Sequence, residues 1–247
     1  IWKQALKSIL SPGNKVRIPH TKIDINSSAN SEMRCLCVLL VDVSGSMKPC
    51  EDTINTSIKN FMSDLLHGRN GFKEYSKEQI ELAIIQFDSD VKVLRLPSLV
   101  KRGDRLPVLQ VRGLNTNTVG AVRKAMSIIE NRKIEHKMKG LSYYRPWIIL
   151  LTDGNPNPCS QSELQSLLYD VSHSISDNKF MLTAIGIGNS VDKEFLSAIS
   201  NNNYHRIGQV NISTFFQALS ASMTMKYGND PQNNLSIELD NELQDDI

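Results

Sequence analysis

Three short polar segments carry the residues of this sequence that could do chemistry. Residues 42–46 read DVSGS, residues 113–118 read GLNTNT and residues 152–154 read TDG. Two of these segments supply an aspartate, and hydroxyl side chains stand at alternate positions beside them. Carboxylate and hydroxyl oxygens form the donor set that a hard divalent cation prefers. The pattern therefore predicts a site for Mg²⁺, with Mn²⁺ or Ca²⁺ as alternatives, that an acidic group from outside could complete.

The apolar pattern between residues 33 and 227 predicts the elements that would position these segments. Strand-like apolar runs occupy residues 35–41, 82–87, 91–96, 147–151, 180–187 and 204–207. Helical spacing of apolar residues occurs over residues 54–66, 122–129, 164–175, 195–199 and 215–223. Alternating strands and helices predict an α/β, Rossmann-like fold with a mostly parallel sheet of about six strands and helices on both faces.

Two details of this pattern bear on the site. The runs 82–87 and 91–96 are joined by only three residues, which predicts a hairpin and hence one antiparallel edge strand. In a parallel sheet of this kind, ligands bind beyond the carboxyl ends of the strands. Residues 42–46 and 152–154 directly follow predicted strands, so we expect the polar segments to face one crevice.

Charge is distributed unevenly along the 247 residues, although the net charge is only +2, which is too small to predict nucleic-acid binding. Five bases precede the first acid, Asp24: Lys3, Lys7, Lys15, Arg17 and Lys22. Six acids follow the last base, Lys226: Asp230, Glu238, Asp240, Glu242, Asp245 and Asp246. We expect a basic arm and linker over residues 1–32, a compact domain over 33–227 and a flexible acidic tail over 228–247. A carboxylate of that tail could bind the metal of its own or a neighbouring copy.

The apolar runs and the cysteines bear on location. Every run is much shorter than the ~20 residues that span a bilayer, so we expect no transmembrane helix, no signal peptide and no membrane partner. Cysteines are few for this length, and Cys35 and Cys37 point to the same face of a strand, where they do not bridge. These features predict a reducing, cytoplasmic location.

The three polar segments together resemble the von Willebrand factor A domain family. DVSGS is similar to the family's DxSxS signature, residues 113–118 to its threonine loop and TDG to its later aspartate motif, in the same order and within residues 35–225. The resemblance implies a metal-ion-dependent adhesion site. In that arrangement Ser44, Ser46 and Thr116 bind the metal through their hydroxyls, while Asp42 and Asp153 bind it directly or through water.

The threonine loop departs from the family pattern. Leu114 and Asn115 stand where many members have two glycines, so Thr118 stays open as an alternative ligand to Thr116. We favour Thr116, because the Asn-Thr-Asn-Thr run then matches the commoner pattern and leaves Thr118 to cap the following helix.

The resemblance also implies a function. Family members of this type are non-catalytic modules in which a Glu or Asp of a partner protein completes the coordination of Mg²⁺. The Phe87-Asp88-Ser89 turn and the length of the chain look most like the bacterial branch found with tellurite-resistance and stress-response gene clusters. That likeness implies a role in a stress-response or signalling assembly.

A metal-dependent hydrolase or phosphatase that uses the same acidic crevice is the alternative. A haloacid-type phosphatase needs a second aspartate where Ser44 stands, and a serine hydrolase needs a glycine where Asp42 stands. Residues 186–188 lack the third glycine of a dinucleotide site. Lysines and arginine interleave with aromatics over residues 133–147, which is compatible with nucleic-acid binding. We favour a solvated helix end before a buried strand for that segment, and expect a binding protein rather than an enzyme.

Overall fold

A six-stranded sheet is the core of the structure, a computed structural model that describes residues 33–113, 115–154, 156–188, 191–207 and 216. The strand order is β3-β2-β1-β4-β5-β6. The strands are β1 (Cys35–Asp42), β2 (Ile80–Phe87), β3 (Val91–Leu99), β4 (Trp147–Thr152), β5 (Met181–Ile187) and β6 (Tyr204–Ile207). All neighbours pair in parallel except β2 and β3, which form an antiparallel edge hairpin. The predicted α/β fold is confirmed.

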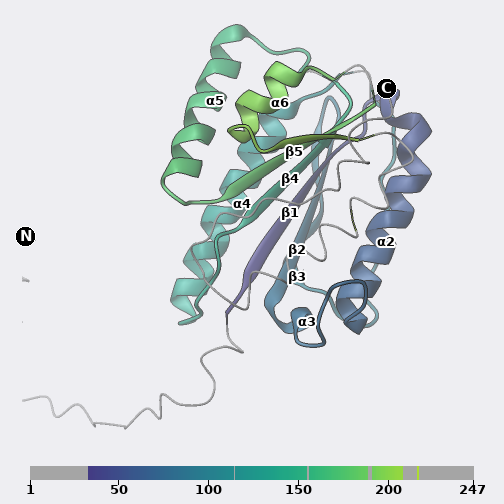
Figure 1. Cartoon of the computed structure of the whole chain (residues 1–247), viewed down its shortest axis with the longest axis vertical. Coiled ribbons are helices and arrows are strands. Elements are labelled where there is room, and N and C mark those ends of the chain that lie inside the picture. The colour runs from purple at the N-terminus through teal and green to yellow at the C-terminus, as the bar shows by residue number, and fades with distance from the viewer. Residues whose placement is uncertain (1–32, 114, 155, 189–190, 208–215, 217–247) are drawn as a thin grey trace, which may run out of the picture. The chain divides into compact units, whose positions relative to one another are not determined.

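Helices cover both faces of this sheet, as Figure 1 shows. The helical elements are η1 (Gly45–Cys50), α2 (Glu51–His67), α3 (Ser76–Gln79), α4 (Thr118–Met138), α5 (Gln161–Ser176) and α6 (Lys193–Ser200). Buried residues of α2 share one hydrophobic cluster with the sheet, and those of α4, α5 and α6 share the other. The predicted arm (1–32) and tail (228–247) lie outside the described residues, as does the helix expected at 215–223 apart from Phe216.

Strand β1 illustrates why the sequence forms a doubly covered sheet. All eight of its residues are buried. Cys35, Cys37, Leu39 and Val41 contribute to the cluster on the α2 side, whereas Leu36, Val38 and Leu40 contribute to the cluster on the other side. Residues 35–41 show no polar alternation because a strand that is buried on both faces has no solvent-facing side, and the one polar residue, Asp42, stands at the carboxyl end.

The cysteines and helices add two observations. All four cysteines are free, and Cys35 and Cys37 lie on the same face of β1, as predicted. Within the described residues, no helix combines the length and the apolar character needed to cross a membrane.

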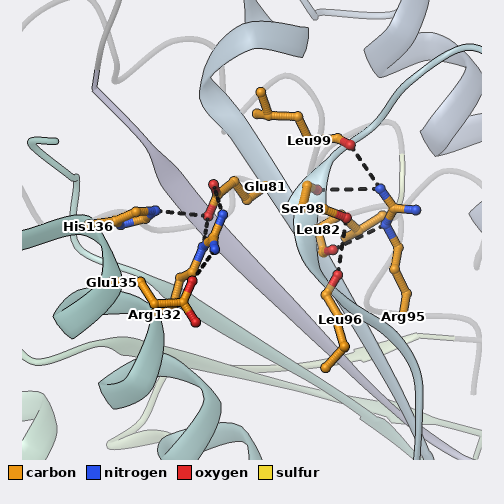
Figure 2. A network of polar contacts seen from close by, with 9 residues as sticks. All are labelled: Glu81, Leu82, Arg95, Leu96, Ser98, Leu99, Arg132, Glu135 and His136. Atoms are coloured by element: carbon orange, nitrogen blue, oxygen red, sulfur yellow. Dashed lines mark hydrogen bonds and ion pairs between the residues drawn. The ribbon is translucent and has the colours of Figure 1, made fainter. Parts of the chain in front are cut away.

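A buried ionic network joins β2 to α4, and Figure 2 shows it from close by. Glu81, which is only 2 % exposed, accepts hydrogen bonds from Nε (2.8 Å) and Nη2 (2.5 Å) of Arg132. His136 Nε2 lies 3.1 Å from Glu81 Oε2, and Arg132 also pairs with the more exposed Glu135. Burial would raise the pKa of Glu81, but the hydrogen bonds and charge of Arg132, with those of His136, lower it below its ordinary value. The network therefore fastens the C-terminal half of α4 to the sheet.

Arg95, also drawn in Figure 2, stabilises the irregular part of the β2–β3 ladder. Its Nε donates to the carbonyl of Leu82 (3.2 Å) and its Nη2 to the carbonyl of Leu99 (3.0 Å). The same guanidinium pairs with Asp104 at 2.9 Å. These bonds occupy carbonyls at the register shift, where the regular ladder is interrupted.

Replacing Glu81 tests the weight of this network. Glu81→Ala should lower the free energy of unfolding by about 3 to 5 kcal/mol, because two partners of the lost carboxylate would be left in a buried site. Glu135→Ala, which removes a half-exposed partner of the same arginine, should cost less than about 1 kcal/mol. Urea unfolding of both variants measures the difference, and equal losses would contradict a dominant role for the buried pair.

The same network predicts how stability depends on pH. The pKa of Glu81 lies below its ordinary 4.5, and burial lowers the pKa of His136 below its ordinary 6.5 despite the nearby carboxylate. Both groups bind protons more readily in the unfolded chain, so stability should be full at neutral pH and fall with acid. The His136 contribution should fade below pH 6.5 and the Glu81 contribution below pH 4.5. A Glu81→Gln variant should lose the second phase in urea unfolding series.

Candidate metal centre

Backbone hydrogen bonds bring the three polar segments together beyond the carboxyl ends of β1 and β4. Gly45 N donates to the carbonyl of Gly113 (2.7 Å), and Arg112 N donates to the carbonyl of Val43 (3.2 Å). Thr116 exchanges two backbone hydrogen bonds with Asn157, which follows the TDG segment (2.7 and 3.0 Å). The threonine loop is therefore bonded to the DVSGS segment and to the chain just after the TDG segment.

Four of the five predicted ligands form one chain of hydrogen bonds. Asp42, which is fully buried, accepts from Ser44 N through Oδ1 (2.8 Å). Ser44 Oγ lies 3.2 Å from Ser46 Oγ, and Ser46 Oγ donates to Asp153 Oδ1 (2.9 Å). Asp42 and Ser44 are buried whereas Ser46 is exposed, so the chain leads from the core to the surface.

The fifth predicted ligand, Thr116, lies beside this chain. Its side chain is largely buried, with 7 % of the residue exposed. A Cβ built on Gly154, the neighbour of Asp153, would lie 4.0 Å from Thr116 Oγ1. The Thr116 hydroxyl is therefore next to the TDG segment. The structure places all five predicted residues around one end of the sheet.

Thr118 does not cap α4, so that prediction is wrong. The N-cap is Asn117, whose side-chain oxygen accepts from Gly120 N (2.9 Å). A Cβ at position 120 would lie 2.7 Å from Asn117 Oδ1, so any other residue there would displace the capping side chain. The amide stands one residue before the threonine and reaches the first turn, so the helix begins earlier than expected. The Thr118 hydroxyl is fully buried and has no hydrogen-bond partner within the described residues.

Sequence reasoning missed the supporting roles of two residues, Thr152 and Asp88. Thr152 Oγ1 donates to Asp42 Oδ2 (2.6 Å), which joins β4 to the buried carboxylate of β1. The backbone carbonyl of Asp88 accepts a hydrogen bond from Asn117 N (2.8 Å). The Asp88 side chain packs so closely on Gly113 that a Cβ added at Gly113 would lie 2.3 Å from the Cβ of Asp88. Both residues stand at or just beyond the end of a strand, and that position is the sequence feature that could have identified them.

The electrostatics of the site favour a cation. Burial raises the pKa of Asp42, although hydrogen bonds from Thr152 and Ser44 oppose that rise, and the charge of Asp153 adds to it. Burial also raises the pKa of Asp153, against the hydrogen bond from Ser46. Two carboxylates that are disfavoured as anions gain most from a nearby positive ion.

The donor set fits a hard divalent cation. The described residues contain no group of three or more His, Cys, Asp or Glu side chains suited to a metal. The two aspartates are instead accompanied by the hydroxyls of Ser44, Ser46 and Thr116, so every candidate donor is oxygen. Mg²⁺, Mn²⁺ and Ca²⁺ prefer such donors, whereas softer metals prefer sulfur or imidazole.

The Thr152 bond to Asp42 can be tested without any metal. In EDTA, Thr152→Val should lower the free energy of unfolding by about 1 to 3 kcal/mol, because a buried carboxylate oxygen would lose its hydroxyl donor. Thr152→Ser keeps that donor and should retain most of the stability. Urea unfolding of the two variants gives the comparison, and a valine variant as stable as the unchanged protein would show that the bond contributes nothing.

Solved structures share this fold. A von Willebrand factor type A protein from Catenulispora acidiphila has a TM-score of 0.56 and 16 % identity over 78 % of this chain and 43 % of its own. The von Willebrand factor domain of the type V pilus tip protein Mfa5 from Porphyromonas gingivalis has a TM-score of 0.55 and 11 % identity, over 81 % of this chain and 98 % of its own. Proximal thread matrix protein 1 of the mussel byssus has a TM-score of 0.51 and 16 % identity, over 79 % of this chain and 47 % of its own. In that structure the MIDAS (metal-ion-dependent adhesion site) motif is occupied by zinc. This chain thus spans less than half of the first and third structures.

At such identities the likeness shows the fold alone, and no curated protein sequence matched the chain. The family assignment rests on the sequence profile of the von Willebrand factor type A domain, which matches residues 37–221. The matched stretch covers most of the chain and contains all five predicted ligands. The chain belongs to the von Willebrand factor type A domain family.

Proposed function

We propose that this protein is a non-catalytic binding module that captures a Glu or Asp of a partner protein through a bound Mg²⁺. The metal would be held by Asp42, Ser44, Ser46, Thr116 and Asp153. One observation carries the proposal: the hydrogen-bonded chain from buried Asp42 through Ser44 and Ser46 to Asp153, with the Thr116 hydroxyl beside it. Domains of this family are typically metal-dependent binding modules, which supports the same interpretation.

The bound cation would supply positive charge that an acidic side chain can approach. Asp42 is held in place by Thr152 and by the Ser44 backbone, so its orientation does not depend on a ligand. Ser46 is exposed and Asp153 is partly exposed, so these two residues form the accessible side of the site. The five side-chain donors leave one position of an octahedral ion open, and a carboxylate oxygen from outside is the donor that could fill it.

The choice of metal follows from the donors. A related mussel protein has zinc in its MIDAS motif, and zinc is therefore the competitor to test. An all-oxygen donor set suits Mg²⁺, Mn²⁺ and Ca²⁺, whereas zinc sites usually include thiolate or imidazole ligands. We further propose a cytoplasmic location, which the few and free cysteines support. We also propose a role in a bacterial stress-response assembly of the tellurite-resistance type, which the sequence resemblance at Phe87-Asp88-Ser89 supports.

Calorimetric titration with Mg²⁺ and Zn²⁺ tests the site. Asp42→Ala should abolish Mg²⁺ binding, because three hydroxyls cannot replace a lost carboxylate. Asp90→Ala, which removes an exposed carboxylate from the β2–β3 turn, is the matched control and should bind normally. Unchanged affinity of the Asp42 variant would overturn the assignment. Binding of zinc with no detectable binding of Mg²⁺ would overturn the choice of metal, because zinc binds most oxygen sites more tightly than Mg²⁺ and a higher zinc affinity alone decides nothing.

A pair of valine variants decides between the two threonines. Thr116→Val should weaken Mg²⁺ binding by at least about tenfold through loss of a donor oxygen. Thr118→Val should leave the affinity unchanged and keep or raise stability, because it replaces a buried hydroxyl without a described partner by a methyl group. The reverse result would make Thr118 the ligand.

The proposed capture of an acidic partner is tested by a pull-down from the source cell with this protein as bait. We expect a protein that is retained in Mg²⁺ and released by EDTA, and whose binding falls when its critical Glu or Asp is changed to the amide. Binding that survives both treatments would indicate a metal-independent surface. Hydrolysis of a phosphate ester that requires both Mg²⁺ and Asp42 would instead support the hydrolase alternative.

A further inference from the structure

Cationic side chains from three segments gather around the turn between α5 and β5. Lys133 of α4 donates from Nζ to the carbonyl of Lys179 (2.7 Å). Arg145, which precedes β4, donates from Nε to the carbonyl of Phe180 (3.0 Å) and from Nη2 to that of Ile175 (2.6 Å). This turn leads into the start of β5, which runs parallel to β1 and β4, so it lies at the end of the sheet opposite the candidate metal centre.

The charge around this turn is mainly positive. The charged groups that act on Lys133 are Glu130, Lys137, Lys179 and Arg145, of which only the first is an acid. Burial and these three cations lower the pKa of Lys133. Lys179 pairs with Asp177 (3.3 Å), but the exposed Lys137 and Lys139 form no ion pair within the described residues. We call Lys133, Lys137, Arg145 and Lys179, together with Lys139 at the C-cap of α4, the cationic cluster.

The aromatic residues of this region are not arranged for nucleic-acid binding. Tyr144 and Trp147 are only 9 % and 2 % exposed, so their rings belong to the core. The Tyr143 ring lies against His136, with 5.7 Å between centroids, and against Lys133, with 6.0 Å from Nζ to its centroid. Bases could not stack on the buried rings, so a flexible acidic polypeptide fits this surface better than a nucleic acid.

We propose that the acidic segment of residues 228–247 binds the cationic cluster, in the same chain or in a second copy of it. The segment carries six acids and no base, which makes it complementary in charge to the cluster. The chain from Phe216 to the first and last of these acids can span at most roughly 46 to 100 Å when fully extended. That reach exceeds the radius of gyration of about 16 Å that a domain of this size has.

Binding of the acidic segment to the cationic cluster differs from binding of the same segment to the metal. The first depends on low salt and the second on a bound metal. Contacts between exposed charges are screened by salt and need no metal. Binding of a tail carboxylate to Mg²⁺ would be lost in EDTA. The inference does not rest on the proposed metal function, so either can fail without the other.

Zero-length carboxyl-to-amine cross-linking of the full chain, followed by mass spectrometry, tests the proposal. In protein stripped of metal with EDTA and then exchanged into a low-salt buffer without carboxylates or amines, carboxylates of residues 230–246 should link to Lys137, Lys139 and Lys179 in preference to the exposed Lys92 and Lys193. High salt should remove these links, and Mg²⁺ should leave them unchanged. The mass of the linked species shows whether they join one chain or two.

A double variant separates the cluster from chance proximity. Lys137→Gln with Lys179→Gln should reduce the remaining links at Lys139 about fivefold, because two exposed charge pairs are lost. Lys92→Gln with Lys193→Gln is the matched control and should not change them. Links spread evenly over all exposed lysines, links confined to the lysines of residues 1–32, links that require Mg²⁺, or no links at all would each overturn the proposal.

Discussion

The buried carboxylate of Asp42 is the constraint on which the site depends. An ionised group without hydrogen bonds is very costly inside a protein, so its two oxygens must find donors. The donors are the backbone of Ser44 and the hydroxyl of Thr152 (2.8 and 2.6 Å). These bonds set the direction in which the chain leaves β1 and tie it to β4. The position of the two serines follows from that turn.

The topology of the sheet carries the constraint outward. Because β1 and β4 are parallel neighbours, Asp42 and the TDG segment emerge at the same edge. The threonine loop then leads directly into α4, whose N-cap Asn117 is bonded to Asp88 beyond the end of β2. The other half of α4 is fastened to β2 by Glu81. Helix α4 is about 30 Å long. Its N-terminal end is bonded to the turn after β2 and its C-terminal half to β2 itself, so both ends of the helix that follows Thr116 are anchored.

The sequence was enough to predict the elements whose signal is local. The apolar run of residues 35–41 in β1, the three-residue link between β2 and β3, and the helical spacing of residues 54–66 in α2 all act through neighbours in the chain. The five predicted ligands were chosen from the motifs that resemble the family's. Asp42, Ser44, Ser46 and Asp153 stand at or just after strand ends, and Thr116 stands in the loop before α4. The amino-acid sequence was also sufficient to group them, since parallel strands end at one edge.

Features that depend on distant pairs could not be predicted in this way. Glu81 and Arg132 are 51 positions apart, and Thr152 and Asp42 are 110 apart, so neither pair leaves a pattern in one sequence. The cap of α4 was missed for a different reason. Asn117 and Thr118 are both good capping residues, and the absence of a side chain at Gly120 favours the amide.

The central claim is that a divalent cation binds where the two aspartates and three hydroxyls meet. Anomalous diffraction from crystals of the full chain grown with Mn²⁺ tests it most directly, because the metal is then located without reference to any ligand. The account predicts one peak within bonding distance of the hydroxyl oxygens of Ser44, Ser46 and Thr116. A peak elsewhere, or none at saturating Mn²⁺, would contradict it.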